Sequence, residues 1–295
     1  MTDVLQHLAS GLMMGGVLAL LATGLALIFG VMGVVNFAHG DLVMVAMYAA
    51  LLTATATAIP GVLIAVLMLP VFLVVGWLLH YLLIGRLAVS SDGRAADRDH
   101  DAQLLLTLGL SLVLQNAALM VFGSDPRGGG GIQDPVRVAG IVLDTQRLVA
   151  FAVATIAGVA LLLILERTSL GRGMRAAAAD PVAAQYCGVE VRRAHRTAFA
   201  IGTGLAGVGG GLLATFYPIQ PFVSLDFIIL MFAAVVLGGL GSVAGACLGG
   251  LVIGVVQGLG QLVLPLELQS LTVFGVFLLV LFVRPQGFFG KAVRV

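Results

Sequence analysis

The chain has 295 residues, of which 60% are hydrophobic and only 10% are charged, and its formal net charge at pH 7 is +1. Its mean hydropathy is +1.12. Soluble domains carry about 25% charged residues, so this composition excludes an ordinary soluble protein. The near-zero net charge gives no indication of a nucleic-acid partner. The composition instead predicts a protein whose solvent is the lipid bilayer.

Apolar residues follow one another without interruption, as from Val149 to Leu165. This pattern predicts membrane-spanning helices, because the strands of a membrane barrel alternate polar and apolar residues. The candidate spans are residues 8–32, 37–58, 61–84, 103–122, 148–166, 196–216, 225–241, 242–264 and 270–283. The expected fold is therefore all-α, a polytopic transmembrane helical bundle of eight to ten spans, with residues 1–295 forming a single domain.

The basic residues predict which loops face the cytoplasm, where Lys and Arg accumulate. Two clusters stand out: Arg167, Arg172, Arg175, Arg192, Arg193 and Arg196 in one loop, and Arg284, Lys291 and Arg294 in the tail. Both are expected to be cytoplasmic. With nine spans, the loop at 85–102 is then also inside, while the N-terminus and the loop at 123–147 lie outside.

Two short segments interrupt the apolar pattern, at Asn36–Asp41 and at Leu237–Ser242. In the first, Asn36 suits the cap of a new helix and Asp41 complements its positive end. The alternative is that His39 and Asp41 line a translocation path or relay protons. The second segment is either a loop outside the membrane or a break within it that produces discontinuous half-helices. The candidate path or helix-break residues are Asn36, His39, Asp41, Gly238, Gly239, Gly241 and Ser242.

Glycine recurs every four residues in several spans, which places small residues in a stripe on one helix face. The sets are Gly11 and Gly15, Gly207 and Gly211, Gly241, Gly245 and Gly249, and Gly250, Gly254 and Gly258. Chance accounts for some of this spacing in a chain with 40 glycines. The two consecutive ladders near the C-terminus favour close packing against a neighbouring helix.

The chain has a single lysine, Lys291, and Ala292 follows it. A phosphate-binding loop of the Walker A type needs Lys next to Ser or Thr, so the chain carries no such ATPase of its own. No HExxH or Ser-His-Asp grouping predicts an enzyme. The two cysteines match no metal or redox spacing, so neither a catalytic nor a metal site is expected.

Acidic residues lie mostly at span ends, whereas ion-coupled carriers need them at membrane depth. A transporter powered by a separate ATPase subunit is therefore favoured. The rival hypothesis is a stand-alone ion-coupled or passive carrier for small polar solutes such as amides or urea.

The predicted cytoplasmic loop at 167–195 contains a short helix with clear boundaries. Asp180 suits the N-cap, Pro181 the first helical position, and Gly188 the left-handed position after the end. The enclosed helix, Val182–Cys187, is under two turns long and would be marginal in water alone. We expect it to be held by docking into a partner. The alternative is an amphipathic helix on the membrane surface.

Several segments together resemble one family. They are Gly24–Gly30, Asn36–Asp41, Thr107–Ser111, Leu114–Asn116, Gly171–Ala176, Asp180–Gly188, Val236–Ser242 and Arg284–Gly287. In this order, over nearly the whole chain, they resemble the branched-chain amino acid permeases of bacterial ATP-binding cassette importers, of the LivH type. Residues 1–295 are then one transmembrane permease domain with a cytoplasmic coupling loop at 167–195.

The resemblance implies an inner-membrane (plasma-membrane) subunit that moves branched-chain or related hydrophobic amino acids. It implies as partners a second permease subunit of the LivM type, two ATP-binding subunits and an extracytoplasmic solute-binding protein. ATP and Mg would bind those partner ATPases, with no cofactor on this chain. Ala183 and Ala184, followed by Gly188, are similar to the coupling motif of such importers. The motif usually begins with Glu, where this chain has Val182.

Overall fold

The structure is a computed structural model that describes residues 2–85, 93–128, 135–138, 141–262, 269–284 and 287–289. Its long helices are α1 (Thr2–Met32), α2 (His39–Ala56), α3 (Gly61–Leu79), α5 (Gly93–Phe122), α6 (Thr145–Arg167), α9 (Val191–Leu213), α10 (Val223–Gly238), α11 (Val243–Gly260) and α12 (Gln269–Val283). The π-helical turn η1 (His80–Ile84) extends α3, and the short helices α7 (Ser169–Ala179) and α8 (Pro181–Tyr186) follow α6. Strands β1 (Val136–Val138) and β2 (Ile141–Leu143) form an antiparallel hairpin with Val136 opposite Leu143.

The predicted all-α bundle is confirmed. Within the described residues, six helices are long and apolar enough to cross a membrane: α1, α2, α3 with η1, α5, α6 and α11. Helices α10 and α12 contain shorter apolar segments. Helix α9 occupies the remaining predicted span, and its residues from Ala198 onward are mostly buried inside the bundle. The small β-hairpin lies in the loop expected to be external.

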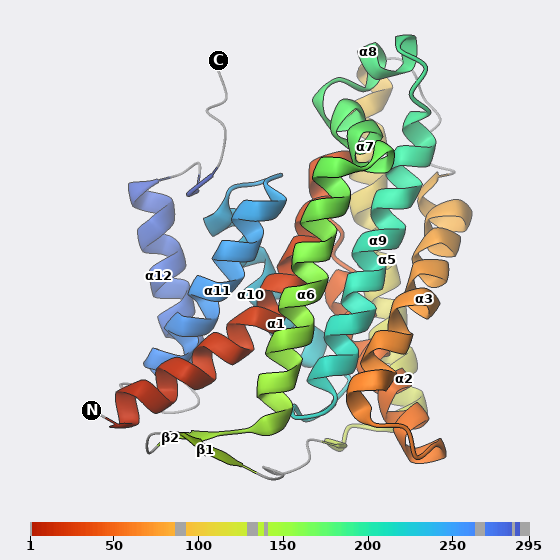
Figure 1. Ribbon diagram of the computed structural model, residues 1–295. Helices are drawn as coiled ribbons and strands as arrows, with labels where there is room; N and C mark the ends of the chain where they lie inside the picture. The colour runs from red at the N-terminus through yellow and green to blue at the C-terminus, as the bar shows by residue number, and fades with distance from the viewer. Residues whose placement is uncertain are drawn as a thin grey trace.

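Figure 1 shows the N-terminus and the β-hairpin at one end of the bundle, and α7, α8 and the C-terminal end of α12 at the other. This arrangement agrees with the predicted membrane topology, in which the loop at 167–195 and the tail lie on one side of the membrane and the loop at 123–147 lies on the other. Arg86, Lys291, Arg294 and Glu267 lie outside the described residues. The assignment of the α7–α8 end to the cytoplasm stays a prediction from the arginine distribution.

Glycines bring α1 and α11 into backbone contact. A Cβ built on Gly11 would lie 2.7 Å from the carbonyl oxygen of Gly254, and one built on Gly254 would overlap the backbone of Gly15. Gly250 and Gly258 meet the backbone of α1 in the same way. No side chain fits between these helices, so the predicted packing face is confirmed. Bilayer proteins use such close approach because lipid supplies no hydrophobic force between helices.

The segment Leu237–Ser242 is a turn between two antiparallel helices. Gly239 and Gly241 have positive φ angles of 103° and 84°, which let the chain reverse, and Ser242 accepts a hydrogen bond from the Gly245 N–H (3.1 Å) to cap α11. A Cβ on Gly30, near the end of α1, would lie 3.1 Å from the Gly241 oxygen. The turn therefore lies where α1 ends, and it joins two helices instead of interrupting one.

The segment after α12 binds back to this turn. The N–H groups of Phe288 and Phe289 donate to the carbonyl oxygens of Leu237 (2.9 Å) and Gly238 (3.0 Å). These two carbonyls belong to the last turn of α10, where intrahelical partners are missing. The tail thus completes the hydrogen bonding of α10.

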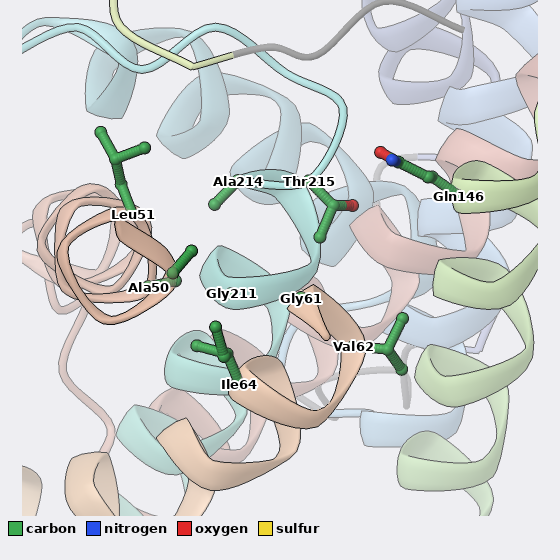
Figure 2. A pocket seen from close by; sticks show the side chains of 10 residues that line it. Ala50, Leu51, Gly61, Val62, Ile64, Gln146, Gly211, Ala214 and Thr215 are labelled. Carbon is green, nitrogen blue, oxygen red and sulfur yellow. The ribbon is translucent and has the colours of Figure 1, made fainter. Parts of the chain in front are cut away.

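A hollow of about 210 Å³ lies where α2 and α3 meet the end of α9 and the start of α6. Figure 2 shows Leu51, Ile64 and Ala214 around it, with Thr215 and Gln146 as its polar contributors. It is at the end of the bundle opposite α8. The hollow is therefore a small, mostly apolar opening on the side predicted to be external.

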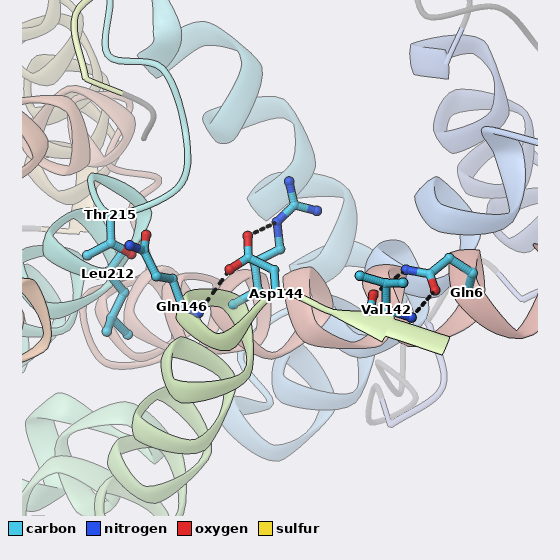
Figure 3. A network of polar contacts seen from close by, with 7 residues as sticks. Gln6, Val142, Asp144, Gln146, Leu212 and Thr215 are labelled. Atoms are coloured by element: carbon cyan, nitrogen blue, oxygen red, sulfur yellow. Dashed lines mark hydrogen bonds and ion pairs between the residues drawn. The ribbon is translucent and has the colours of Figure 1, made fainter. Parts of the chain in front are cut away.

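The β-hairpin ties the start of α1 to the start of α6 (Figure 3). The Gln6 side chain donates to the Val142 carbonyl (2.6 Å) and accepts from the Val142 N–H (2.8 Å). Asp144 caps α6, because its Oδ1 accepts from the Gln146 N–H at 2.9 Å. The other carboxylate oxygen lies 3.6 Å from Nε of Arg147.

We expect Asp144→Ala to lower the free energy of unfolding by about 1 kcal/mol, because the α6 N-cap is lost. Asp144→Asn keeps an acceptor oxygen at the cap and removes only the weak ion pair with Arg147, so it serves as the control. Thermal unfolding in detergent measures both. Equal destabilisation by the two substitutions would show that the ion pair, and not the cap, contributes the stability.

Candidate functional site

The cytoplasmic-loop candidate is built from α7 and α8. Thr168 caps α7 by accepting from the Gly171 N–H (3.2 Å), and Arg175 donates to the carbonyl of Leu165 at the end of α6. Met174 and Ala177 are buried on the inner face of α7. The helix is thus fixed across the end of the bundle and holds α8 in place.

The predicted cap residues of α8 are confirmed, although the helix covers Pro181–Tyr186 instead of the expected Val182–Cys187. Asp180 is the N-cap and accepts from the N–H groups of Val182 (2.9 Å) and Ala183 (3.0 Å), and Pro181 is the first helical residue. Gly188 has a φ of 81°. Its N–H donates to Gln185, and the Val189 N–H donates to Ala184, which is the hydrogen-bond pattern of a Schellman C-cap. This six-residue helix is fully capped at both ends.

Helix α8 projects from the end of the bundle (Figure 1). Val182 is 61% exposed and Tyr186 is 88% exposed, whereas Ala184 is buried. Of the two predicted motif alanines, Ala183 therefore faces outward and Ala184 packs inward. A groove of about 410 Å³ lies beside α8, between α7 and the start of α9. The exposed face of α8 and the groove together form a surface to which a partner protein could bind.

The helix break at residues 33–38 corrects one prediction. Helix α2 begins at His39 and its N-cap residue, Ala38, makes no side-chain cap. Asn36 lies two residues earlier, and its Oδ1 accepts from the Ala38 N–H (3.1 Å), so it forms an Asx turn before the helix and is not the cap itself. Asp41 lies in the first turn of α2, where it was predicted to complement the positive helix end, and its carboxylate also accepts from Nε2 of Gln115 on α5 at 2.9 Å. The tertiary hydrogen bond from Gln115 is thus an addition to the predicted local position of Asp41.

Polar groups gather inside the bundle around the start of α2. His39 is fully buried, its ring packs 3.4 Å from where a Cβ of Gly24 would lie, and neither ring nitrogen makes a hydrogen bond within the described chain. Gly24 precedes the end of α1 by about two turns, so α2 starts well inside the bundle. Gly40 contacts the backbone of Ser224 in the first turn of α10. Two helix N-termini, neither with a side-chain cap, therefore lie close together at the buried cluster.

One face of α5 continues this polar region, and sequence reasoning missed it as a site. Polar residues recur every four positions, at Gln103, Thr107, Ser111 and Gln115, which places them on one face over about 18 Å. Thr107 is 2% exposed, whereas Met120 on another face is 87% exposed. The four-residue spacing inside an otherwise apolar span was the available signal. The Gln115–Asp41 hydrogen bond joins this face to the cluster of Asn36, His39 and Asp41, and together these residues are called the polar line.

No group of three His, Cys, Asp or Glu side chains within the described parts of the chain is arranged to hold a metal ion. Gly238, Gly239, Gly241 and Ser242, predicted as path or helix-break residues, form the α10–α11 turn. The structure therefore does not join them to the buried cluster around His39.

The Asp41–Gln115 pair gives a direct test of this polar line. We expect Asp41→Leu to destabilise the fold by about 1–3 kcal/mol, because the buried Gln115 amide loses one of its two acceptors, the other being the Ser111 hydroxyl. Asp41→Asn retains an oxygen that can accept from Gln115 and should keep most of the stability and transport. Thermal unfolding and substrate uptake measure the two effects. Loss of uptake in a fully stable Asp41→Asn protein would instead indicate that the negative charge itself participates in transport.

Residues 7–281 match the family described as "Branched-chain amino acid transport system / permease component". The high-affinity branched-chain amino acid transport system permease protein BraD of Pseudomonas aeruginosa is 30% identical over 97% of this chain and 96% of its own length. LivH of Escherichia coli K12, named in the same way, has the same identity and coverage.

A probable branched-chain amino acid transport permease protein LivH of Methanocaldococcus jannaschii is 30% identical over 85% of this chain and 79% of its own length. No solved structure matches the chain. The relatives are named as transport permeases, and six described helices have the length and apolar character of membrane spans, as expected of a multi-pass inner-membrane protein. The chain belongs to the branched-chain amino acid transport system permease family.

Proposed function

We propose that this chain is the transmembrane permease subunit of an ATP-binding cassette importer that moves branched-chain or related hydrophobic amino acids across the inner membrane, with residues 1–295 acting as one permease domain. The observation that carries the proposal is the match to named permeases over nearly the full length of both proteins. Under this proposal, the chain binds and passes substrate and leaves ATP hydrolysis to other subunits.

The doubly capped α8 supports the coupling role proposed for Asp180, Pro181, Ala183, Ala184 and Gly188. A helix of six residues has few internal hydrogen bonds, and its exposed Val182 and Tyr186 suit docking into a groove of an ATP-binding subunit. Two such subunits would bind ATP and Mg. A second permease of the LivM type and an extracytoplasmic solute-binding protein would complete the importer.

The buried polar line is the proposed path. An amino acid carries a carboxylate and an ammonium group, and both need partners at membrane depth. The uncapped N-termini of α2 and α10 offer backbone N–H groups to a carboxylate, while Asp41 and the α5 side chains offer acceptors. The hollow in Figure 2 lies at the opposite end from α8, on the side where a solute-binding protein would deliver substrate.

A stand-alone ion-coupled carrier for amides or urea is the alternative, and one observation favours it. His39 and Asp41 are both buried inside the bundle, where ionisable residues often serve proton or ion coupling. Such a carrier would work without ATP-binding subunits and would respond to the membrane potential.

Uptake into vesicles distinguishes the two. The purified chain is reconstituted alone, and with its sister permease and binding protein in the presence or absence of the ATP-binding subunits, and radiolabelled leucine uptake is measured. We expect uptake only with the ATP-binding subunits and ATP, and no change when the membrane is depolarised at constant ATP. Potential-driven uptake by the chain alone would support the carrier and refute the importer.

A further inference from the structure

A second pocket, of about 240 Å³, lies outside the polar line and the α7–α8 surface. It opens where η1, at the end of α3, faces the start of α9. His80 and Tyr81 line it from one side, and Arg192, His195 and Arg196 line it from the other. The pocket is at the same end of the bundle as α7, since both α3 and α9 reach that end (Figure 1).

The pocket is positively charged. Arg192 and Arg196 are four residues apart on α9 and so lie on one helix face. The one ion pair found among the described side chains is that of Arg147 with Asp144, so neither pocket arginine is neutralised by a described carboxylate. Nε of Arg196 makes no hydrogen bond there. Two guanidinium groups in this arrangement favour an oxyanion such as phosphate, which can accept hydrogen bonds from both.

His80 adds an independent indication that the pocket takes a ligand. Its side chain lines the pocket and only 5% of the residue is exposed, yet its Nδ1 has no hydrogen-bond partner in the described chain. Buried polar atoms normally have a hydrogen-bond partner. A ring nitrogen without one, beside two arginines, suggests a ligand that hydrogen-bonds to His80 and to both guanidinium groups. The π-helical turn that carries His80 is a distortion often found at functional sites.

The surroundings identify the kind of ligand. Trp77 and Tyr81 stack on each other with ring centroids 5.5 Å apart, and the Arg196 guanidinium lies 5.4 Å from each ring. Both rings are about half exposed, at 45% and 51%. The outer face of α3 leading to them is apolar and exposed, as at Val74 (66%). Aromatic residues of this kind mark the level of lipid headgroups at the end of a span.

We infer that this pocket binds the phosphate of an anionic phospholipid, whose acyl chains lie along the exposed face of α3. Basic pockets between helices on the cytoplasmic side of a membrane bind headgroups of this class. The Arg196 side chain, held against Trp77 and Tyr81, is positioned at the boundary between the phosphate and the acyl chains. The site is independent of the transport path and of the docking surface on α8.

Trp77 is the only tryptophan in the chain and reports on the site directly. The full-length protein is reconstituted into phosphatidylcholine bilayers that contain equal small fractions of either brominated phosphatidylglycerol or brominated phosphatidylcholine, and Trp77 quenching is measured. We expect the anionic lipid to quench more strongly. Its apparent affinity should fall about fivefold in Arg192→Gln and roughly 25-fold in the double variant with Arg196→Gln, at about fivefold per arginine.

Arg193→Gln is the matched control, because Arg193 is adjacent in sequence but lines the groove beside α7. It should retain the preference for the anionic lipid. Unchanged quenching by brominated phosphatidylcholine verifies in each variant that α3 still sits in the bilayer. Equal quenching by the two lipids in the native chain, or undiminished preference in the double variant, would overturn the proposal. Displacement of the lipid by millimolar inorganic phosphate would overturn the lipid assignment in favour of a free-phosphate site.

Discussion

Gly254→Ala is expected to separate α1 from α11 and to cause a large loss of stability for a single added methyl group. The new Cβ would overlap the Cα and N of Gly15 and the carbonyl of Gly11, all of which are backbone atoms that no rotamer change can move. Overpacking that forces a backbone shift costs about 3 kcal/mol at the upper end of its usual range. We expect at least this loss in unfolding free energy, with little folded protein recovered at 37 °C.

Gly275→Ala provides the control for this prediction. Gly275 is also in the middle of an apolar helix, α12, but a Cβ there would meet nothing within 4 Å. Alanine favours the helix over glycine, so this variant should be as stable as the native chain or slightly more stable. Thermal unfolding followed by size-exclusion chromatography measures both proteins. Similar melting temperatures for the two variants would contradict the close packing of α1 on α11.

Gly188→Val should uncouple transport from ATP hydrolysis while leaving the bundle folded. Valine has space at this position, since nothing lies within 4 Å of the added Cβ, but it must adopt a φ of 81°. That conformation costs an L residue about 1–2 kcal/mol, and more for a β-branched side chain. A helix of six residues has little stability of its own to offset this cost. We expect uptake and substrate-stimulated ATP hydrolysis to fall together, roughly tenfold.

Two variants separate backbone strain from other effects at this turn. Gly188→Asn should retain most activity because asparagine tolerates the left-handed conformation. Asp180→Ala should cause a smaller loss than valine, since the N-cap contributes about 1 kcal/mol. The measurements are stimulated ATPase activity and co-purification of the ATP-binding subunits. If Gly188→Val leaves both unchanged, α8 is only a connector between α7 and α9.

The boundaries that sequence reasoning predicted well are those that depend on neighbouring residues. The span predicted at 61–84 ends with η1 at Ile84, and the caps of α8 are the predicted Asp180 and Gly188. The first boundary depends on the length of an apolar run and the second on the residues that cap a helix, and both can be recognised in a single sequence. Helix α5 instead begins at Gly93, ten residues before its predicted start. The prediction followed the apolar run, and the first part of this helix is polar.

The buried cluster could not be predicted because its contacts are distant in sequence. Asp41 and Gln115 are 74 positions apart, and only the packing of α5 against α2 brings them together. Local rules assigned Asp41 to the helix terminus, since an acidic residue in the first turn is usually placed there. The polar spacing on α5 was visible in the sequence, but it does not indicate which helix that face meets. The same limit applies to the basic pocket between η1 and α9.

The pairing of α1 with α11 also constrains how the protein is made. About 200 residues separate the end of α1 from the start of α11, so at about 5–20 residues per second the ribosome needs roughly 10 to 40 seconds to supply the partner. During this interval, the glycine face of α1 is in the membrane without the helix that later covers it. Release of a nascent chain that stops before residue 243 would leave that face permanently open. Such truncated products should be preferred substrates for membrane proteases. Proteases should recognise the uncovered glycine face of α1 only if synthesis ends without α11.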